Sequence, residues 1–314
     1  MHSAPIPPPV PPLDAEQLLA EVNRHTDAGL RLTGRAAAGE VGAGYVAWPD
    51  GRHGVLTRSG APVSELRKTQ AVLERVAAVG IPSPHYQQIV DLGEQRAIIQ
   101  QRLPGSSPER VDAGLVVQLV DLVETLRGLS GTGSVAPEVN LHLTSSGPGF
   151  CVHETLSGYD ARSRRLLGRI REIGRDAPPE HGDDLVHLDF HPANVLVDDA
   201  GRISGLVDWD GIGRGDRRFA LVTLTFDLSF GIAHRDGYRA LDPADLAPVL
   251  DGLAAAPVER VRRWWASMSL RQVDWTIRHS YPIEVIDFYL ALATRGLDRL
   301  TADRPLSSSE LFPA

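Results

Sequence analysis

The chain has 314 residues, of which 42% are hydrophobic and 23% are charged. This balance is typical of a globular protein, and the length suits two compact units or one large bilobal domain. A formal net charge of −8 at pH 7 argues against a general nucleic-acid-binding protein, because phosphate neutralisation needs a cationic face.

Features that bear on location point to the cytoplasm. The single cysteine, Cys151, cannot form an internal disulfide, and we expect it to be a small buried apolar residue. No apolar run approaches the roughly 20 residues of a transmembrane helix, so no membrane partner is expected. Residues 1–13 are rich in proline and lack the cationic start and apolar centre of a signal peptide. We expect them to form a disordered or polyproline-type tail.

Residues 14–103 predict a small antiparallel sheet with added helices. Asp14 is a favourable N-cap for a helix over 14–24, whose apolar residues recur with helical spacing. Short runs bounded by glycine and proline turns predict the strands. The expected strands cover residues 30–32, 44–48, 54–58, 87–92 and 96–103, with a helix over 62–79 before the fourth.

Beyond residue 104 the pattern becomes helical. Leucines spaced by 4, 3, 4 and 3 residues predict an amphipathic helix with a buried seam, formed by Leu115, Leu119, Leu122, Leu126 and Leu129. Further helices are expected over 159–173, 259–279 and 282–300. The sequence therefore indicates an α+β protein with an N-terminal lobe over 14–103 and a C-terminal lobe over 104–314, joined near 101–105.

The segment over 185–216 carries the most informative pattern, LVHLDFHPANVLVDDAGRISGLVDWDGIGRGD. A short apolar strand leads to Asp189, a loop returns to Asn194, and a hairpin follows. Antiparallel pairing centred on residue 200 places Asn194 opposite Leu206, with Asp208 one pleat away at the same end. Asp189, Asn194 and Asp208 are therefore expected to converge.

These three side chains suit phosphoryl transfer. Asn194 and Asp208 supply hard oxygen ligands, which Mg²⁺ prefers when it also binds substrate phosphates. Transfer requires the protein mainly to position the reacting groups and to neutralise charge, while a carboxylate accepts the proton of the attacking hydroxyl. A positioned general base of this kind contributes about 10²- to 10⁴-fold in rate.

The run HLDFHPANVL over 187–196, followed by VDW over 207–209 and GD over 215–216, resembles the aminoglycoside phosphotransferase family. The DW pair begins 14 residues after the asparagine and the GD pair 7 residues further on, and this spacing makes the match specific. The resemblance implies a small-molecule kinase with a bilobal protein-kinase-like fold. Its small antiparallel-sheet lobe would bind the nucleotide, and its larger, mainly helical lobe would carry catalysis and substrate binding.

Carried over by position, the resemblance implies roles for five residues of this segment. Asp189 is the implied catalytic base, and Asn194 and Asp208 are the implied magnesium ligands. His187 and Asp216 are implied to support the catalytic loop. The implied cofactors are ATP or GTP, with Mg²⁺.

The resemblance also implies nucleotide contacts elsewhere. Gly39 lies in a glycine-containing turn between two strands, where a loop can cover phosphates. Arg58 stands where the family carries a phosphate-binding lysine, and arginine holds phosphate bidentately but is bulkier. The alternative is that Arg58 is a solvated surface charge. Gln101 and Leu103 match the segment between the lobes, whose backbone meets the adenine ring.

Some positions depart from the family pattern or stay open. The glutamate that pairs with the phosphate-binding cation is unclear, because Thr69 stands in its place, with Glu65 one turn earlier and Glu74 just beyond. The usual acidic run after the GD pair is replaced by Phe219–Leu221. Asp210 either assists the metal ion or faces water, and we favour the second interpretation.

Substrate candidates lie mainly on the helical lobe. His191 either packs the catalytic loop or touches the acceptor. Asp274, Glu284 and Asp287 lie in or beside expected helices, although the first turn of a helix favours acidic residues by itself. The nearby tryptophans, Trp275 among them, are more often core residues than a ligand platform.

Two functions fit this pattern. The first is an ATP-dependent phosphotransferase that moves the γ-phosphate to a hydroxyl of a small molecule, either an aminoglycoside-like antibiotic, with antibiotic resistance as one role, or a metabolite. The second is a non-catalytic, pseudokinase-like nucleotide-binding module, suggested by the replaced lysine. The intact Asp189, Asn194 and Asp208 favour the enzyme. A protein kinase is disfavoured because no activation segment ending in alanine-proline-glutamate follows. The sequence predicts no nucleic-acid partner and leaves monomer and dimer open.

Overall fold

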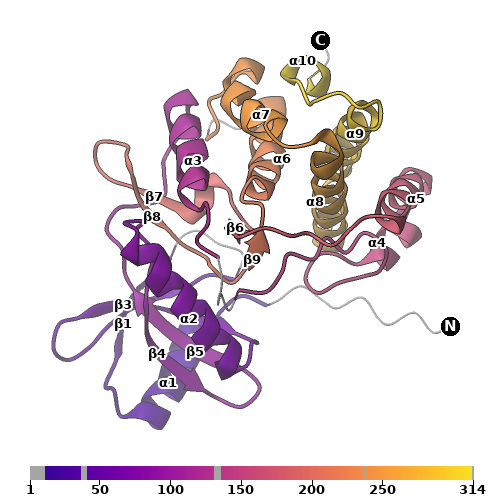
Figure 1. The fold of residues 1–314 in the computed structure, drawn as a ribbon. Coiled ribbons are helices and arrows are strands. Elements are labelled where there is room, and N and C mark those ends of the chain that lie inside the picture. The colour runs from indigo at the N-terminus through magenta and orange to yellow at the C-terminus, as the bar shows by residue number, and fades with distance from the viewer. Residues whose placement is uncertain (1–10, 37–40, 131–135, 236–237, 313–314) are drawn as a thin grey trace.

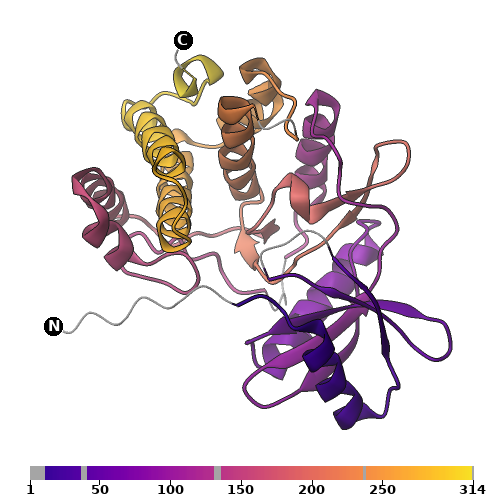
Figure 2. The same cartoon turned by 180° about the vertical axis from the view of Figure 1, so that it is seen from behind.

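The computed structural model describes residues 11–36, 41–130, 136–235 and 238–312 and shows two lobes. A small lobe built around one sheet lies below a larger lobe of helices in Figure 1, and Figure 2 shows both lobes from behind. The expected α+β, bilobal architecture is confirmed. Most of the proline-rich tail expected over 1–13 and the turn with Gly39 lie outside the described residues.

The N-terminal lobe is a five-stranded antiparallel sheet in the order β1-β2-β3-β5-β4. Its strands are β1 (Arg31–Arg35), β2 (Gly44–Ala47), β3 (His53–Ser59), β4 (Tyr86–Asp91) and β5 (Arg96–Gln101). Side chains alternate between the two faces, and α1 (Ala15–Thr26) covers one face while α2 (Val63–Ala78) covers the other. On β5, Ala97 and Ile99 join the core under α1, whereas Ile98 joins the core under α2. Strand alternation therefore decides which helix each side chain meets.

Helix α1 begins where the sequence places its cap. The Asp14 carboxylate accepts a hydrogen bond from the Gln17 amide at 3.0 Å, which satisfies one of the free amides of the first turn. The predicted stripe of Leu18, Leu19 and Val22 is buried against the sheet. A local cap and an apolar stripe thus fix this helix.

The C-terminal lobe consists of helices that stand side by side above two short ribbons in Figure 1. The helices are α3 (Ala113–Thr125), α4 (His153–Tyr159), α5 (Ala161–Arg175), α6 (Phe219–His234), α7 (Ala247–Ala254), α8 (Val258–Arg278), α9 (Ile283–Thr301) and α10 (Ser308–Leu311). The ribbons pair β6 (Asp184–His187) with β9 (Ile212–Gly215) and β7 (Val195–Val197) with β8 (Ile203–Leu206). Short 3-10 turns are η1 (Pro192–Asn194) and η2 (Pro243–Leu246). Helix α8 packs along α9 and also contacts α4, α5 and α6.

Some helical regions differ from the prediction. The helix expected over 159–173 corresponds to α5, whereas the preceding α4 was not predicted. Asp160 separates the two helices, because it is extended and forms a reciprocal capping box with Ser163. Helix α6 was not predicted, because most of its residues are buried and its sequence has no amphipathic period. Within the described ranges, no helix has both the length and the apolar character needed to cross a bilayer.

The junction of the two lobes docks on the β7–β8 ribbon. Ser106 and Val197 exchange backbone hydrogen bonds of 3.1 and 2.8 Å. Gly105 has a φ of +94°, and a Cβ there would lie 2.5 Å from the Val197 carbonyl oxygen, so glycine is required. The Leu206 amide donates to the Pro82 carbonyl oxygen at 2.8 Å. These bonds hold the ribbon against the N-terminal lobe.

Candidate active site

The catalytic segment folds as two ribbons and a connecting loop. Strand β6 pairs with β9, and the loop that follows β6 carries Asp189. The loop then returns through η1 to Asn194, which enters β7. Asp189 and Asn194 therefore lie on a loop whose two ends are held by the paired strands β6 and β7.

An irregularity in the β7–β8 ribbon brings Val195, rather than Asn194, opposite Leu206. The Asn194 carbonyl oxygen instead accepts a hydrogen bond from the Val207 amide at 2.9 Å. Asp208 is the next residue along the chain. The predicted register is thus wrong by one residue, and the shift leaves Asn194 and Asp208 at the same end of the ribbon.

Asp189 is held from three directions. Its Oδ1 accepts a hydrogen bond from Arg271 Nη2 at 2.7 Å, and its Oδ2 lies 3.2 Å from Asn194 Nδ2 and 3.3 Å from His191 Nε2. Asn194 Nδ2 also donates to the Asp189 carbonyl oxygen at 2.8 Å. Arg271 donates further to the Leu188 carbonyl oxygen. The carboxylate therefore has a fixed orientation.

The same neighbours control the charge of Asp189. Burial opposes its ionisation, but the hydrogen bond with His191 and the positive charge of Arg271 outweigh burial and hold the pKa of Asp189 below its usual range. Burial likewise opposes the charging of His191, and Asp189 outweighs it, so the pKa of His191 is raised. Asp189 is therefore ionised at neutral pH, and His191 belongs to its immediate surroundings.

Asn194 and Asp208 bring oxygen atoms to this end of the ribbon. The Asn194 amide nitrogen is used by Asp189, and its side-chain oxygen accepts no hydrogen bond from the described residues. Asp208 opens to solvent but is surrounded by protein on its other sides, and this partial desolvation, with the charge of Asp189, raises the pKa of Asp208. Asp208 also has a φ of +61°, an uncommon conformation for a residue with a side chain.

Asp210 adds a further negative charge beside Asp208. Desolvation and the charge of Asp208 raise the pKa of Asp210 to about 6, and burial together with both carboxylates raises the pKa of Tyr86 on β4. A cation near such carboxylates favours their ionised form. Among the described residues, no group of three or more His, Cys, Asp or Glu side chains is arranged to hold a metal ion. The Asn194 and Asp208 side chains offer oxygen donors, the ligand type that Mg²⁺ takes in proteins.

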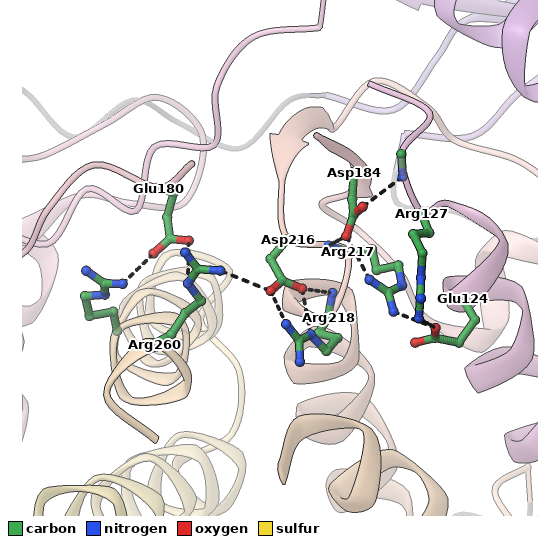
Figure 3. A network of polar contacts seen from close by, with 10 residues as sticks. Glu124, Arg127, Glu180, Asp184, Asp216, Arg217, Arg218 and Arg260 are labelled. Atoms are coloured by element: carbon green, nitrogen blue, oxygen red, sulfur yellow. Dashed lines mark hydrogen bonds and ion pairs between the residues drawn. The ribbon is translucent and has the colours of Figure 1, made fainter. Parts of the chain in front are cut away.

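The two residues expected to support the catalytic loop are buried, but they act in different ways. His187 Nε2 lies 3.1 Å from the Val207 carbonyl oxygen, and burial lowers the pKa of His187 to about 4, so a neutral ring donates this bond. The Asp216 carboxylate pairs with Arg218 at 2.5 Å and Arg260 at 3.2 Å in the network of Figure 3. Within the described residues, the Asp216 carboxylate forms no hydrogen bond to the loop that carries Asp189, and its support of that loop stays a prediction.

Arg58 does not join the catalytic group. It lies opposite Ala97, which belongs to the core under α1, so strand alternation turns Arg58 toward that face. Its guanidinium donates to the Pro11 carbonyl oxygen. The preceding residue, Thr57, lies opposite Ile98 on the face covered by α2. The register of β3 therefore gives no support to the expected contact between Arg58 and phosphate, because it turns Arg58 toward the α1 face.

The two glutamates considered as partners of that cation lie on the surface of α2. Glu65 pairs with Lys68 at 2.8 Å, and Glu74 accepts a hydrogen bond from Gln70 at 3.3 Å. These contacts lie along the helix itself. Neither glutamate marks a phosphate-binding cation on β3.

Gln101 and Leu103 lie at the junction of the lobes, as expected. Gln101 ends β5, and its Oε1 lies 2.9 Å from His85 Nδ1. Leu103 packs on β8, because a Cβ at Gly205 would lie 3.0 Å from Leu103 Cδ1. Leu103 thus borders the ribbon that begins at Asn194.

The acidic substrate candidates are largely occupied by other contacts. Asp274 is fully buried, accepts a backbone amide at the start of α4 at 2.7 Å and lies 3.6 Å from Arg278. Its carboxylate joins the start of α4 to α8, and these contacts give no support to a role in substrate binding. Asp287 pairs with Arg162 at 2.6 Å, whereas Glu284 is exposed in the first turn of α9.

Arg271 is the contact of Asp189 that sequence reasoning missed. It follows Asp189 by 82 residues and lies within α8, a helix expected only from its apolar spacing. Nothing in its sequence surroundings distinguishes it from other arginines on helices. Cys151 lies close enough for the charge of Arg271 to act on it, but burial dominates and raises the pKa of Cys151 to about 11, as expected for a largely buried thiol.

The protein has a sheet lobe and a helical lobe, and the ends of two ribbons carry Asp189, Asn194 and Asp208. This combination is typical of protein-kinase-like phosphotransferases. The sequence profile of the phosphotransferase enzyme family matches residues 43–265. This match covers more than half of the chain, and the protein therefore belongs to that family. No curated protein sequence matches the chain significantly.

Solved structures share the fold over most of the chain. A thermostable mutant of aminoglycoside phosphotransferase APH(4)-Ia, in a ternary complex with AMP-PNP and hygromycin B, is 16% identical with a TM-score of 0.59 and aligns over 90% of this chain and 98% of its own. Amicoumacin kinase hAmiN, in complex with AMP-PNP, Ca²⁺ and Ami, is 12% identical with a TM-score of 0.55 over 96% of each chain. An aminoglycoside phosphotransferase from Alicyclobacillus acidocaldarius is 15% identical with a TM-score of 0.55 over 96% of each chain. At these identities the likeness establishes the protein-kinase-like fold alone.

Proposed function

We propose that the protein is an ATP-dependent kinase that transfers the γ-phosphate of ATP to a hydroxyl of a small-molecule acceptor. The observation that carries this proposal is the orientation of Asp189, an ionised carboxylate held against Asn194 at the end of the ribbon that leads to Asp208. Membership of the phosphotransferase family supports the reaction class. The AMP-PNP complexes of two structural relatives support ATP as the donor.

In the proposed reaction, Asp189 accepts a hydrogen bond from the acceptor hydroxyl. The hydroxyl oxygen bonds to the γ-phosphorus, the bond from that phosphorus to the bridging oxygen breaks, and ADP leaves with the electron pair. The hydroxyl proton passes to Asp189. Because the pKa of Asp189 is low, its contribution is mainly orientation, with the proton accepted late as the new bond forms. Arg271 and His191 keep the carboxylate ionised and in place.

The side-chain oxygens of Asn194 and Asp208 would hold Mg²⁺ in this proposal. Such an ion would supply the positive charge that neutralises the phosphates during transfer. Asp210 adds negative charge beside the same position. The backbone from Gln101 to Leu103 would meet the adenine ring, since that segment borders the ribbon from the N-terminal side.

One observation favours a second candidate, a non-catalytic nucleotide-binding module. Arg58 is turned toward α1, so β3 supplies no arginine or lysine to the face that α2 covers. A phosphotransferase of this fold needs positive charge or metal at the phosphates. The kinase proposal therefore relies on the metal ion and on arginines of the C-terminal lobe.

Turnover with a panel of acceptors separates the two candidates. Purified protein is incubated with Mg·ATP and hydroxylated metabolites or antibiotics, and acceptor-dependent ADP formation is measured. We expect turnover with at least one acceptor, a loss of about 10²-fold or more in Asp189→Ala, and ATP affinity within about twofold of wild type. Asp199→Ala is the matched control, because Asp199 is exposed in the turn of the β7–β8 ribbon.

The outcomes are distinct. ATP binding without turnover of any acceptor favours the non-catalytic module. Turnover that survives in Asp189→Ala overturns the assignment of the base while leaving the family membership intact.

A further inference from the structure

Four half-exposed rings gather at the C-terminal end of α8. The ring centroid of Trp275 lies 5.2 Å from that of His279 and 4.7 Å from that of Tyr281, and Phe150 lies 5.2 Å from His279. Tyr281 is exposed, and the other three are partly exposed. We refer to Phe150, Trp275, His279 and Tyr281 as the α8 aromatic cluster.

The α8 aromatic cluster adjoins the proposed base. Trp275 follows Arg271 by four residues on α8, which places both on one face about 6 Å apart along the axis. Arg271 contacts Asp189 at 2.7 Å. From the other side, Cys151 lies near enough for the charge of Arg271 to act on its thiol, and Phe150 is the preceding residue. An acceptor that reaches Asp189 would therefore meet these rings about one helical turn away.

Four carboxylates around this region are paired with arginines, whereas Glu284 is exposed in the first turn of α9. The pairs, with their shortest distances, are Asp189–Arg271 at 2.7 Å, Asp227–Arg239 at 2.5 Å, Asp274–Arg278 at 3.6 Å and Asp287–Arg162 at 2.6 Å. Charged amines are recognised by carboxylates that are free to accept their hydrogen bonds. An acceptor with several ammonium groups would have to displace these arginines.

Arginine also meets the rings directly. The Arg278 guanidinium lies 5.0 Å from the centroid of the Phe150 ring, so this aromatic face already has a cationic partner. Arg278 is itself paired with Asp274, and Arg271 is paired with Asp189. Apolar and aromatic rings stack on tryptophan and tyrosine faces.

We propose that the α8 aromatic cluster is the acceptor subsite and that it selects a hydroxylated molecule with a flat apolar or aromatic portion and no excess of positive charge, in preference to a polycationic aminoglycoside. This inference rests on the proposed kinase function, whose acceptor class it specifies. Stacking on Trp275 and Tyr281 would hold the ring portion, while a hydroxyl on the same molecule reaches Asp189.

Trp275 provides its own optical probe for this subsite. The sequence contains five tryptophans, and the other four, Trp48, Trp209, Trp264 and Trp265, are buried. A ligand that stacks on the α8 aromatic cluster should therefore quench the fluorescence of Trp275 alone. If the rings only pack the turn between α8 and α9, ligand binding will leave this fluorescence unchanged.

The test uses wild-type protein loaded with Mg·AMP-PNP, so that binding is measured without turnover. The probes are salicin and 4-nitrophenyl β-glucoside as aryl glycosides, uridine as an uncharged nucleoside, and kanamycin and hygromycin B as aminoglycosides. Calorimetry gives each Kd. We expect at least one uncharged aromatic probe to bind about tenfold or more tightly than either aminoglycoside and to quench Trp275.

Variants locate the binding on the cluster. Trp275→Ala should weaken the uncharged probe about tenfold, and Trp275→Phe should retain most of the affinity because it keeps an aromatic face. Tyr159→Ala, which removes an exposed ring at the end of α4, should leave the affinity unchanged. Equal effects of Trp275→Ala and Tyr159→Ala, tighter binding of an aminoglycoside, or no binding of any uncharged probe would overturn the inference.

Turnover then separates this inference from the proposed function. If an uncharged probe binds and quenches Trp275 but no acceptor is phosphorylated, the kinase proposal fails and the subsite stands. If an aminoglycoside is phosphorylated with a higher kcat/KM than every uncharged probe, the kinase proposal stands and the subsite inference fails.

Discussion

The catalytic segment and the acceptor side of the C-terminal lobe are assembled in different ways. Asp189, Asn194 and Asp208 lie within one short stretch of chain, and two ribbons hold them together. Arg271 instead reaches Asp189 from α8, 82 residues further along the chain, and Phe150 joins the other rings of the α8 aromatic cluster because the region of α4 packs against α8. The reaction chemistry is thus encoded locally, whereas the surroundings that select an acceptor depend on tertiary packing.

Removing a proposed metal ligand should lower activity more than any other substitution below, and it tests the catalytic segment, whose residues lie close together in sequence. Asp208→Ala removes a carboxylate from the end of the ribbon, and we expect kcat/KM to fall by about 10²-fold or more, because metal-mediated charge neutralisation contributes several kcal/mol. ADP formation across a Mg²⁺ titration measures this fall in kcat/KM. Asp210→Asn should lose far less, since we assign no metal contact to Asp210, and an equal loss in both variants would contradict the assignment.

Substituting Arg271 tests the contact that tertiary packing brings to Asp189. Arg271→Ala should lower kcat by about 10- to 100-fold, because a hydrogen bond between charged groups contributes about 1.5–3 kcal/mol. The positive charge of Arg271 helps to lower the pKa of Asp189, and Asp189 must be ionised to accept a proton. Its removal should therefore shift the acid limb of the kcat profile to higher pH.

Stopped assays between pH 4 and pH 8 measure this shift, and Arg271→Lys should restore part of it. An unchanged acid limb in Arg271→Ala would show that Arg271 does not control the charge of Asp189.

A substitution in the ion-pair network of Figure 3 tests whether the ion pairs that follow β9 stabilise the fold. Burial opposes the ionisation of Asp216, but its bonds with Arg218 lower the pKa of Asp216, so the folded-state pKa lies below the unfolded value near 3.9. The ionised pair therefore stabilises the fold above about pH 4, and this contribution is lost as pH falls through the folded-state pKa. Asp216→Asn should lose about 2–3 kcal/mol at pH 7.

Urea unfolding at pH 7 and pH 3 measures this effect. The free energy of unfolding of Asp216→Asn should depend less on pH than that of wild type. Asp199→Asn, at an exposed position, should match wild type, and a full acid dependence in Asp216→Asn would contradict the account.

Arg58 should give the smallest effect. Since its guanidinium contacts Pro11 on the α1 face, Arg58→Ala should leave kcat and the KM for ATP within about twofold of wild type. Steady-state kinetics with varied ATP measures both constants. A loss of tenfold or more in kcat/KM for ATP would show that Arg58 reaches the phosphates and that the face assigned to it is wrong.

Local signals predicted most of the fold. The cap at Asp14, the apolar stripe of α1, the succession of strands and helices along the N-terminal lobe and the hairpin after Asn194 all follow from residues near in sequence. Helix α6 escaped prediction because burial on most sides removes the amphipathic period, and α4 escaped because a helix of 7 residues is too short to show one.

The errors at the site have a common cause. A shift of one residue exchanges the faces of a strand, so the sequence could not decide between Thr57 and Arg58 on β3. Arg271 and Trp275 meet the site only through the packing of α8. Chemistry carried by one loop could be predicted, and contacts between distant helices could not.

The central claim is that Asn194 and Asp208 share a phosphate-bound cation in front of Asp189. A crystal structure of the protein with Mn²⁺ and AMP-PNP tests this most directly, because anomalous scattering locates the metal. We predict a metal peak about 2 Å from both the Asn194 side-chain oxygen and the Asp208 carboxylate, with Asp189 facing the γ-phosphate. A metal ion bound away from both residues, or Asp189 turned away from the nucleotide, would contradict the account.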